Sequence, residues 1–291
     1  MKYGMPYKGS KNKIAEWIID QLPKAKHFYD LFGGGGAISH CAALSRKYEV
    51  VHYNELNPLI CKAFEMSVNG EFKNEKRWIS REDFKKLKDV DPYVNLCFSF
   101  GNDGKTYAYS SKNEQFKKAV HYSIMFNDHS LLSQYVDVHG LKYETENIHQ
   151  RRIYLQRYLK RFKDEVKNYC NTDSGNVRNI LQSLERLERL ERLQSLEKLQ
   201  SLEMTNLDYK DMQIEEDSVI YCDPPYVNTN DYKIDFNHTK FYDWCRHQKN
   251  CIISEYTKPI DFKLVGERCK ICTFNDENIK VTTEKLFTVN N

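Results

Sequence analysis

Three residues in one short stretch, Asp223, Pro224 and Tyr226, combine groups that could hold a nucleobase. The stretch reads YCDPPY at 221–226 and follows a run at 217–220 that is typical of a buried strand. Because proline lacks a backbone donor and restricts the residue before it, the strand must end at Asp223 on a stiff turn. The carboxylate and a prolyl carbonyl could accept both hydrogen bonds of an exocyclic amine while the ring stacks on the base. An ordinary strand-ending turn is the alternative that these residues alone leave open.

A glycine-rich turn follows the first expected strand. Residues 27–32 predict a strand, 33–36 are four glycines, and 37–44 predict an apolar helix, as in the first unit of nucleotide-binding α/β folds. Gly34 and Gly36 would let a ligand approach the backbone closely. Ser39 stands where the dinucleotide fingerprint has its third glycine, which counts against a dinucleotide pyrophosphate and leaves room for a cofactor without phosphates. A plain tight turn would also explain it.

An acidic residue ends the second expected strand. The strand covers residues 50–55, and Glu55 comes about twenty residues after the glycine turn, where an acid can accept hydrogen bonds from both hydroxyls of a ribose. Asn57-Pro58 then begins a helix. The glycine turn and Glu55 together predict a cofactor that contains adenosine.

Further strands are expected to complete an α/β sheet. Asp208 and Tyr209 precede the strand that ends at Asp223, and we expect Asp208 to end another strand near the same edge. The remaining expected elements are strands at 251–255, 268–273 and 284–289, antiparallel additions among them, a helix around residue 241 and a polar loop at 227–232.

The alternation of strands and helices is lost between residues 65 and 202, which we interpret as an inserted domain. Charged and aromatic residues become more frequent there. The turn sequence at 101–104, flanked by alternating aromatic residues, predicts a hairpin over 95–109. Residues 115–125 predict a helix.

Basic residues cluster at 151–163 of the inserted segment, with no acid before Asp164. An apolar stripe at helical spacing predicts that this run is one helix, with basic side chains on another face. Such a face could contact DNA phosphates, although a solvated surface helix is equally compatible. The candidate DNA-binding residues are Arg152, Arg157, Lys160 and Arg161.

Leucine recurs at every third position from 184 to 202. An α-helix has 3.6 residues per turn, so a period of three makes the leucines spiral around it, and a coiled-coil seam needs 3.5. We interpret the stretch as an expanded tandem repeat that lengthens the return path from the inserted domain. We assign it no chemistry.

Composition narrows the class of protein. The 291 residues suffice for one large or two modest domains, and the net charge of +3 allows a nucleic-acid partner without requiring one. No run is long and apolar enough to span a membrane, and the first residues lack a signal peptide's apolar core. The nine cysteines are scattered and predict reduced thiols, and the single C-x-x-C at 269–272 predicts a strand rather than a zinc site.

Five motifs, taken in order, resemble those of the Dam-type DNA adenine-N6 methyltransferases. The resemblance covers about residues 1–65 and 203–291, whereas the inserted segment matches in position and loosely in its hairpin, and the leucine repeat has no counterpart. Glu55 departs slightly, because the family more often has Asp there. The matching motifs are YKGSK at 7–11, DLFGGGG at 30–36, Glu55 with Asn57-Pro58, Asp208-Tyr209 and DPPY at 223–226.

The resemblance implies an α/β fold in which a Rossmann-like domain, residues 1–65 and 203–291, binds S-adenosylmethionine. An inserted, mainly helical target-recognition domain would cover 66–202, including the leucine repeat at 181–202. The implied reaction transfers a methyl group to N6 of adenine in DNA after base flipping, and no metal is required. The implied catalytic residues are Asp223, Pro224 and Tyr226. The implied cofactor-binding residues are Tyr7, Lys11, Asp30, Phe32, Gly34, Gly36, Glu55, Asp208, Tyr209 and Asp223.

Partners and alternatives follow from the same resemblance. It implies double-stranded DNA as the partner, a cognate restriction enzyme as a further candidate, and a cytoplasmic protein encoded by a bacterium or phage. The alternatives are methylation of cytosine N4 or of adenine in RNA, and a DNA-binding protein whose methyltransferase fold is not catalytic. Cytosine enzymes more often have Ser before Pro-Pro, so Asp223 favours adenine. A dinucleotide oxidoreductase would leave DPPY unexplained.

Overall fold

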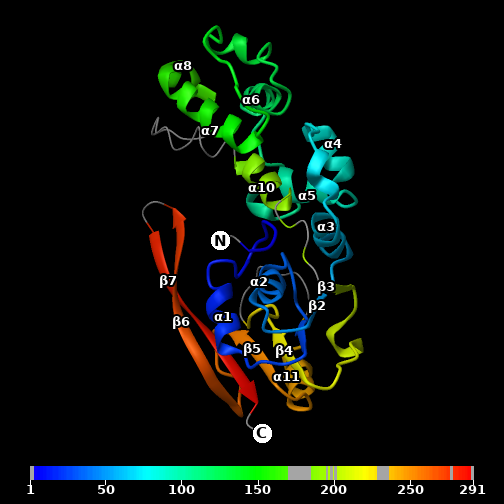
Figure 1. The fold of residues 1–291 in the computed structure, drawn as a ribbon. Coiled ribbons are helices and arrows are strands. Elements are labelled where there is room, and N and C mark those ends of the chain that lie inside the picture. Colours follow the sequence, from blue (N-terminus) through cyan, green and yellow to red (C-terminus); the bar gives the residue numbers. More distant parts are fainter. Residues whose placement is uncertain are drawn as a thin grey trace. The chain divides into compact units, whose positions relative to one another are not determined.

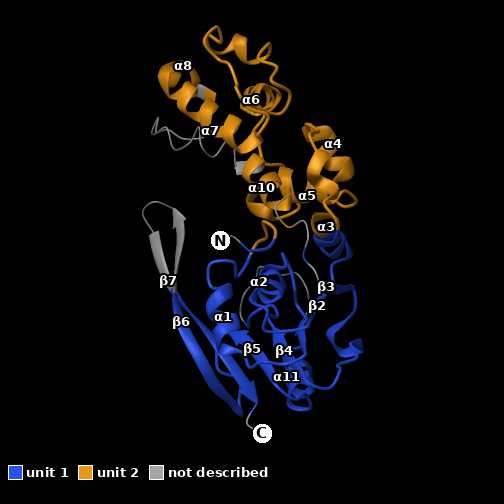
Figure 2. Cartoon of the chain, in the orientation of Figure 1, with its two compact units in different colours: residues 1–4, 9–65, 198–291 blue, residues 5–8, 66–197 orange. Residues whose placement is uncertain are grey.

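The chain divides into two compact units (Figure 2). The first consists of Met1–Gly4, Gly9–Glu65 and Lys198–Asn291, and the second of Met5–Lys8 and Met66–Glu197. The structure is a computed structural model that describes residues 3–169, 185–194, 196, 199, 202–227, 236–275 and 278–289.

The first unit is built on a seven-stranded sheet with the order β3-β2-β1-β4-β5-β7-β6 (Figure 1). Strands β1 to β5 run parallel, β7 pairs antiparallel with β5, and β6 pairs antiparallel with β7. The α/β, Rossmann-like class and the antiparallel terminal strands that we predicted are confirmed. The strands are β1 (His27–Asp30), β2 (Val50–Asn54), β3 (Leu202–Thr205), β4 (Ser218–Cys222), β5 (Cys251–Glu255), β6 (Phe262–Asn275) and β7 (Asn278–Val289).

Helices cover both faces of this sheet (Figure 1). Because side chains alternate along a strand, Phe28 packs with α1 and α2, while its neighbour Tyr29 packs with α11 on the opposite face. Val219 and Ile220 of β4 divide in the same way. The helical elements of this unit are α1 (Ala15–Gln21), α2 (Ala37–Ser45), α3 (Pro58–Val68), the short η6 (Tyr209–Asp211) and α11 (His238–Arg246).

The order of the strands reverses between β1 and β4. From β1 the chain continues to β2 and β3 on one side, and it returns to β4 on the other side. Open α/β sheets bind ligands at such a switch point, beyond the carboxyl ends of the strands. Asp30 is the last residue of β1 and pairs with Tyr221, two positions before Asp223. The two aspartates therefore flank the switch point.

The second unit is mainly helical in the residues that the structure describes. Apart from Met5–Lys8, its sequence begins in the last turn of α3 and ends before β3. Its elements are η1 (Glu71–Asn74), α4 (Arg81–Leu87), α5 (Pro92–Phe98), η2 (Phe100–Asn102), α6 (Glu114–Phe126), η3 (Leu132–Gln134), α7 (Ile148–Leu159), η4 (Lys160–Phe162), α8 (Lys163–Val166), η5 (Lys167–Tyr169) and α10 (Glu185–Gln194).

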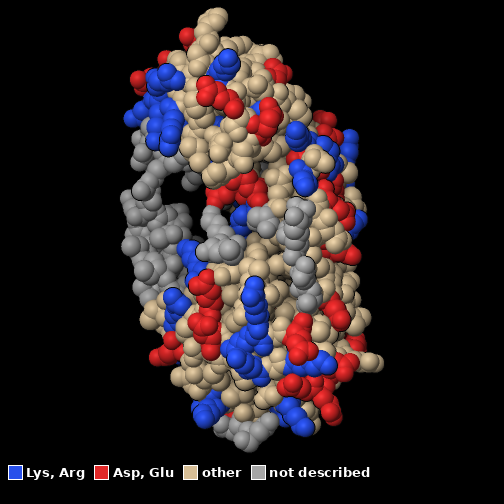
Figure 3. Space-filling model, viewed as in Figure 1, with Lys and Arg blue, Asp and Glu red and all other residues tan. Residues whose placement is uncertain are grey.

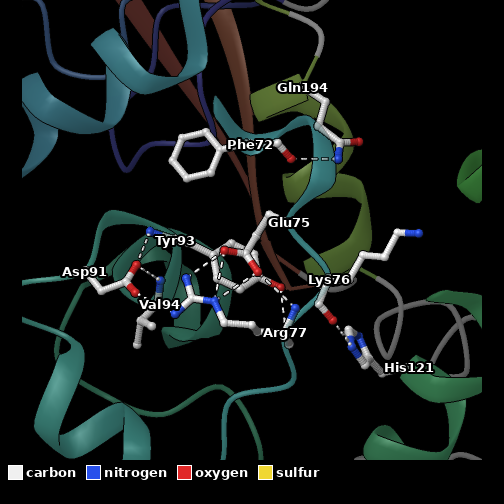
Figure 4. A network of polar contacts seen from close by, with 9 residues as sticks. All are labelled: Phe72, Glu75, Lys76, Arg77, Asp91, Tyr93, Val94, His121 and Gln194. Atoms are coloured by element: carbon white, nitrogen blue, oxygen red, sulfur yellow. Dashed lines mark hydrogen bonds and ion pairs between the residues drawn. The ribbon is translucent and has the colours of Figure 1, made fainter. Parts of the chain in front are cut away.

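The hairpin that we predicted over 95–109 is wrong in its first half, which is helix α5. Asp91 caps this helix by accepting hydrogen bonds from the backbone of Tyr93 and Val94, and Pro92 occupies its first turn (Figure 4). Arg77 holds the Asp91 carboxylate at 2.9 Å. Only one strand-like bridge, between Ser99 and Tyr107, remains in the described part of the segment. A strong helix start thus overrides the alternation of aromatic residues.

Helix α10 covers the middle of the leucine repeat, and Leu187, Leu190 and Leu193 are all buried in the second unit. Each step of three falls about 60° short of a full turn, so three leucines span about 120°, which still forms one apolar stripe. Gln194 donates hydrogen bonds to backbone carbonyls of η1 (Figure 4). This part of the repeat therefore packs into a core and does more than lengthen the chain. Residues 181–184, 195, 197, 198, 200 and 201 lie outside the described residues.

Two composition-based expectations concern membranes and cysteines. In the described part of the chain, no helix combines the length and hydropathy that a membrane crossing needs. Cys269 lies exposed on β6, in the strand that we predicted for the C-x-x-C. The free cysteines among the described residues are Cys41, Cys61, Cys97, Cys222, Cys245, Cys251 and Cys269.

Candidate active site

Asp223 lies directly after β4 and forms a two-pronged ion pair with Lys11. The ammonium Nζ is 2.7 Å from Oδ1 and 2.6 Å from Oδ2. The lysine side chain is 7% exposed and the aspartate side chain 18%. Lys11 precedes α1, and the helix dipole does not favour a cation near the start of a helix. In the structure its ammonium is paired with the Asp223 carboxylate, and a contact with the cofactor stays a prediction.

The pKa values of this pair are set by burial and by a second acid. Burial raises the pKa of Asp223, the Lys11 ammonium opposes this, and the Glu284 carboxylate adds to it. Burial alone would lower the pKa of Lys11, but Asp223 and Glu284 raise it overall. A raised pKa favours the charged lysine but the neutral aspartate. The two contacts of 2.6–2.7 Å favour the charged pair, because such short bonds are typical of an ammonium and a carboxylate, whereas the hydroxyl oxygen of a neutral carboxyl group is a weak acceptor.

The loop after β4 is held by two neighbouring elements. His238, at the start of α11, donates to the Pro225 carbonyl at 2.7 Å. The backbone N–H of Val227 donates to Glu255, the last residue of β5, at 3.2 Å. No described residue donates to the carbonyl of the buried Pro224. Pro224 therefore retains the acceptor that an amine held by Asp223 would also need.

Tyr226 is fixed at its hydroxyl and at its ring. The hydroxyl donates to Glu284 and lies 3.0 Å from the Ser254 hydroxyl. Tyr256 packs edge-on, with ring centroids 4.5 Å apart, and Lys11 Nζ is 4.8 Å from the Tyr226 ring centroid. These contacts fix the orientation of the Tyr226 ring.

Ser254 and Glu284 were not among the site residues that we predicted from the sequence. Both lie in strands, where we expected structural residues only. The sequence did contain one indication for Glu284. It lies two positions before the buried Leu286, so the two side chains share one face of β7. A charged residue at such a position is unusual and needs a partner.

Glu55, which follows β2, binds the glycine turn. Its two oxygens accept hydrogen bonds of 2.8 Å from the backbone N–H groups of Gly34 and Asn57. Burial raises its pKa, while these two donors lower it. Each carboxylate oxygen accepts more than one hydrogen bond, so capacity remains for two ribose hydroxyls.

The glycine turn needs its glycines. Gly34 and Gly36 have φ angles of 50° and 68°, which favour glycine. A Cβ atom on Gly36 would lie 2.1 Å from the ring of Phe64. The turn is therefore held between β1 and α2 in a form that other residues could not adopt.

Ser39 explains the missing third glycine. Its backbone N–H and its hydroxyl both donate to Asp30 Oδ2, at 3.2 and 2.6 Å. Asp30 is 1% exposed. Burial, opposed by Ser39 and aided by the charge of Asp223, raises its pKa to about 7. A glycine at position 39 would leave this buried acid with one donor fewer.

Aromatic rings gather beyond the ends of β1 and β3. Phe32 contacts Tyr209, Phe236 and Phe241, with ring centroids 5.5–5.8 Å apart. Asp208 begins η6, and its carboxylate binds both the backbone and the ammonium of Lys210. Its side chain is 32% exposed, so it can still accept from a ligand.

Most of the residues that the resemblance named lie together at one edge of the sheet. Four acids, which we call the carboxylate row, lie at or shortly after the carboxyl ends of four neighbouring parallel strands: Asp30, Glu55, Asp208 and Asp223. Tyr7 is the exception, because it lies in Met5–Lys8 of the second unit. Its contact with a cofactor stays a prediction, as do the roles of the basic residues near α7.

The model of the D12 class N6 adenine-specific DNA methyltransferases matches residues 7–285. The chain belongs to this family. A comparison with curated proteins finds no match. As a member of the D12 class, the enzyme methylates N6 of adenine at specific sites in DNA and takes the methyl group from S-adenosylmethionine.

The residues present fit this cofactor. Four carboxylates at one edge of the sheet suit the cationic sulfonium and amino groups of S-adenosylmethionine, and would repel a pyrophosphate. Glu55 has acceptor capacity left for a ribose, and the rings around Phe32 offer an aromatic surface for adenine. The positions of these residues at the edge of the sheet are compatible with a methyl donor bound near Asp223.

Proposed function

We propose that Glu55, Asp208, Asp30 and the glycine turn hold S-adenosylmethionine, with Asp223 between the cofactor and the target base. Glu55 accepts from the ribose hydroxyls and Asp208 from the adenine amine of the cofactor. Gly34 and Gly36 allow the close approach that the methionine part needs. The arrangement of these groups at one switch point supports the proposal.

Asp223 and Pro224 hold the target adenine in this proposal. The amino lone pair of adenine is delocalised into its ring and is a poor nucleophile. Two acceptors, the Asp223 carboxylate and the Pro224 carbonyl, draw the nitrogen toward tetrahedral geometry and aim its lone pair. Tyr226 stacks on the flipped base, which offsets part of the cost of leaving the duplex. The observation that carries this proposal is the oriented Asp223 carboxylate directly after β4.

The chemical step needs orientation and charge stabilisation. The cofactor supplies an electrophilic methyl group. As the N6–carbon bond forms and the carbon–sulfur bond breaks, positive charge develops on N6, and Asp223 stabilises it at hydrogen-bond distance. Asp223 also accepts the hydrogen bond of the amino proton that N6 must lose, and its carboxylate can take up that proton. Placement of base and methyl group in line supplies much of the remaining acceleration.

Long-read sequencing of DNA from cells that express the enzyme tests this function. We expect N6-methyladenine in a single sequence context, and none in cells that express Asp223→Ala. Methylation that persists in the variant would refute the role of Asp223. We propose a cognate restriction enzyme as a partner. The methylated motif would give the sequence that it cleaves, because methylation should block cleavage of the same sequence.

Replacing Glu55 with alanine should weaken binding of S-adenosylmethionine about ten- to a hundredfold. The variant loses two hydrogen bonds to a charged acceptor, each worth about 1.5–3 kcal/mol in principle, and part of this is returned by solvent. Isothermal titration calorimetry measures the change. Glu49→Ala is the matched control, since Glu49 is exposed at the other end of β2. Equal affinity of both variants would remove Glu55 from the cofactor site.

We propose further that the second unit contacts duplex DNA through the exposed basic residues at the end of α7. Arg157, Lys160 and Arg161 are exposed, and Figure 3 shows Lys and Arg side chains gathered over α7 and α8. Arg152 is a weaker candidate, because its side chain is 11% exposed and its Nε lies 2.9 Å from Glu191. We call Arg157, Lys160 and Arg161 the α7 basic patch.

Replacing Arg157 and Lys160 together with alanine should make the salt dependence of DNA binding shallower. Removal of one cation that neutralises a phosphate reduces the slope of log K against log salt by about 0.9, so we expect a change of about two. Fluorescence anisotropy with one duplex at several salt concentrations measures it. The control is the double variant Lys85→Ala, Lys86→Ala, which removes two exposed lysines from α4. If both double variants give the wild-type slope, the patch is an ordinary solvated surface.

A further inference from the structure

Glu284 is a completely buried acid in the middle of β7, within the first unit. One of its oxygens, Oε1, accepts from the hydroxyls of Tyr226 and Ser254, the latter at 2.5 Å, and lies 3.8 Å from Lys11 Nζ. The other oxygen, Oε2, is buried and has no hydrogen-bond partner among the residues that the structure describes. Nothing in the sheet itself requires an acid there.

A buried carboxylate with one unsatisfied oxygen destabilises a fold. An apolar side chain at this position would pack beside Leu286 without that cost. Through Oε1, Glu284 contacts Tyr226, which follows Asp223 in the sequence, and Lys11, the counterion of Asp223. Tyr226 and Lys11 come from segments far apart in the sequence, and Glu284 contacts both.

We propose that Glu284 is a positioning residue for methyl transfer, because it anchors Tyr226 and shares the Lys11 ammonium with Asp223. The proposal rests on the function proposed for Asp223 and Tyr226. Through the Tyr226 hydroxyl, Glu284 holds the ring in the orientation on which the base stacks. Glu284 also attracts the Lys11 ammonium and so weakens the ion pair between Lys11 and Asp223. The Asp223 oxygens must also accept from the incoming amine.

The second part of this role predicts a shift in pH dependence. The groups that face Asp223 are Lys11 before α1, Asp30 on β1, Tyr221 on β4, Tyr226 on its own loop and Glu284 on β7. The charge of Glu284 raises the pKa of Asp223. In Glu284→Gln that charge is gone and Lys11 pairs with Asp223 alone, so Asp223 should stay ionised at lower pH.

The test measures single-turnover methyl transfer from pH 5 to 8, on a duplex that carries the motif found by sequencing. For Glu284→Gln we expect the acid limb of the profile to move down by at least about half a pH unit. Glu16→Gln is the matched control, because Glu16 also accepts from a tyrosine hydroxyl, that of Tyr3 at 2.5 Å, but does not face Asp223. A purely structural role would lower the rate equally at every pH.

A second readout isolates the Tyr226 anchor. With 2-aminopurine in place of the target adenine, stacking on Tyr226 quenches the fluorescence. Glu284→Ala should raise the fluorescence of the enzyme–DNA complex, whereas Glu284→Gln, which keeps an acceptor for the Tyr226 hydroxyl, should restore the quenching. Glu284→Gln should therefore restore the quenching of 2-aminopurine fluorescence but not the wild-type pH profile.

The outcomes separate the two proposals. If the wild-type enzyme transfers no methyl group to the duplex, the function proposed for the site fails. If the wild type is active and Glu284→Gln keeps the wild-type acid limb, the role of Glu284 is refuted. It is also refuted if Glu284→Ala binds DNA with wild-type quenching. The isosteric Glu284→Gln variant keeps the test decisive even if the alanine variant does not fold.

Discussion

Replacing Asp223 with alanine is expected to lower the single-turnover rate of methyl transfer about a thousandfold, with binding of S-adenosylmethionine nearly unchanged. Loss of one preorganised group that stabilises transition-state charge costs about 10² to 10³ in rate. In the proposed mechanism Asp223 also orients the amine, so we expect a decrease at the upper end of this range. In the proposed site the cofactor is held mainly by Glu55 and the glycine turn, whereas Asp223 forms its ion pair with Lys11.

The alanine variant also leaves the buried Lys11 with a weaker partner, so its stability needs a control. Asp223→Asn keeps an acceptor beside the ammonium and has almost the same shape. We expect it to fold like the wild type, to bind the cofactor, and to lose most of its activity, because the amide is neutral and accepts on one atom only. Transfer by both variants at more than a tenth of the wild-type rate would remove Asp223 from catalysis.

Replacing Lys11 with methionine is expected to lower the rate at neutral pH about a hundredfold, with recovery as the pH rises. In the wild type, burial and Glu284 raise the pKa of Asp223, and Lys11 opposes them. Without Lys11 the pKa of Asp223 rises further, and less of the carboxylate is ionised at pH 7. The acid limb of the pH profile should therefore move upward, opposite to the shift expected for Glu284→Gln.

The stability of this variant should change with pH in the same sense. The pKa of Asp223 would be raised in the folded state above its unfolded value near 3.9. The folded protein then binds more protons than the unfolded one between these two values, so stability is present at low pH and is lost as pH rises through the folded pKa. Thermal melting from pH 5 to 8 should show a growing deficit against wild type.

Lys13→Met serves as the control for Lys11→Met, because Lys13 is exposed two positions later in the same segment. It should change neither the pH profile nor the melting temperature. If Lys11→Met has a wild-type acid limb, the ammonium does not set the ionisation of Asp223. The opposite shifts expected for Lys11→Met and Glu284→Gln distinguish an electrostatic effect from general damage, which would lower both profiles alike.

The sequence by itself determined the parts of this protein that depend on local patterns. Strand, glycine turn and helix at 27–44 are encoded by short-range backbone preferences, and so are the strand before Asp223 and its stop at two prolines. Glu55, the acid after the second strand, can be found from its distance along the chain to the glycine turn. These features suffice to predict the fold class and most residues of the proposed cofactor site, because the carboxyl ends of parallel strands meet at one edge of the sheet.

Only the tertiary structure decided the contacts between residues that are distant in the chain. Lys11 and Asp223 are 212 positions apart, and Tyr226 and Glu284 are 58 apart. No periodicity relates such residues, so neither the counterion nor the buried acid could be paired from sequence. Likewise, Arg152 in a basic run is neutralised by Glu191 of the leucine repeat. The capped start of α5 prevailed over aromatic alternation, because hydrogen bonds at a helix start act on the backbone directly, whereas alternation stabilises a strand only where a sheet is present to receive it.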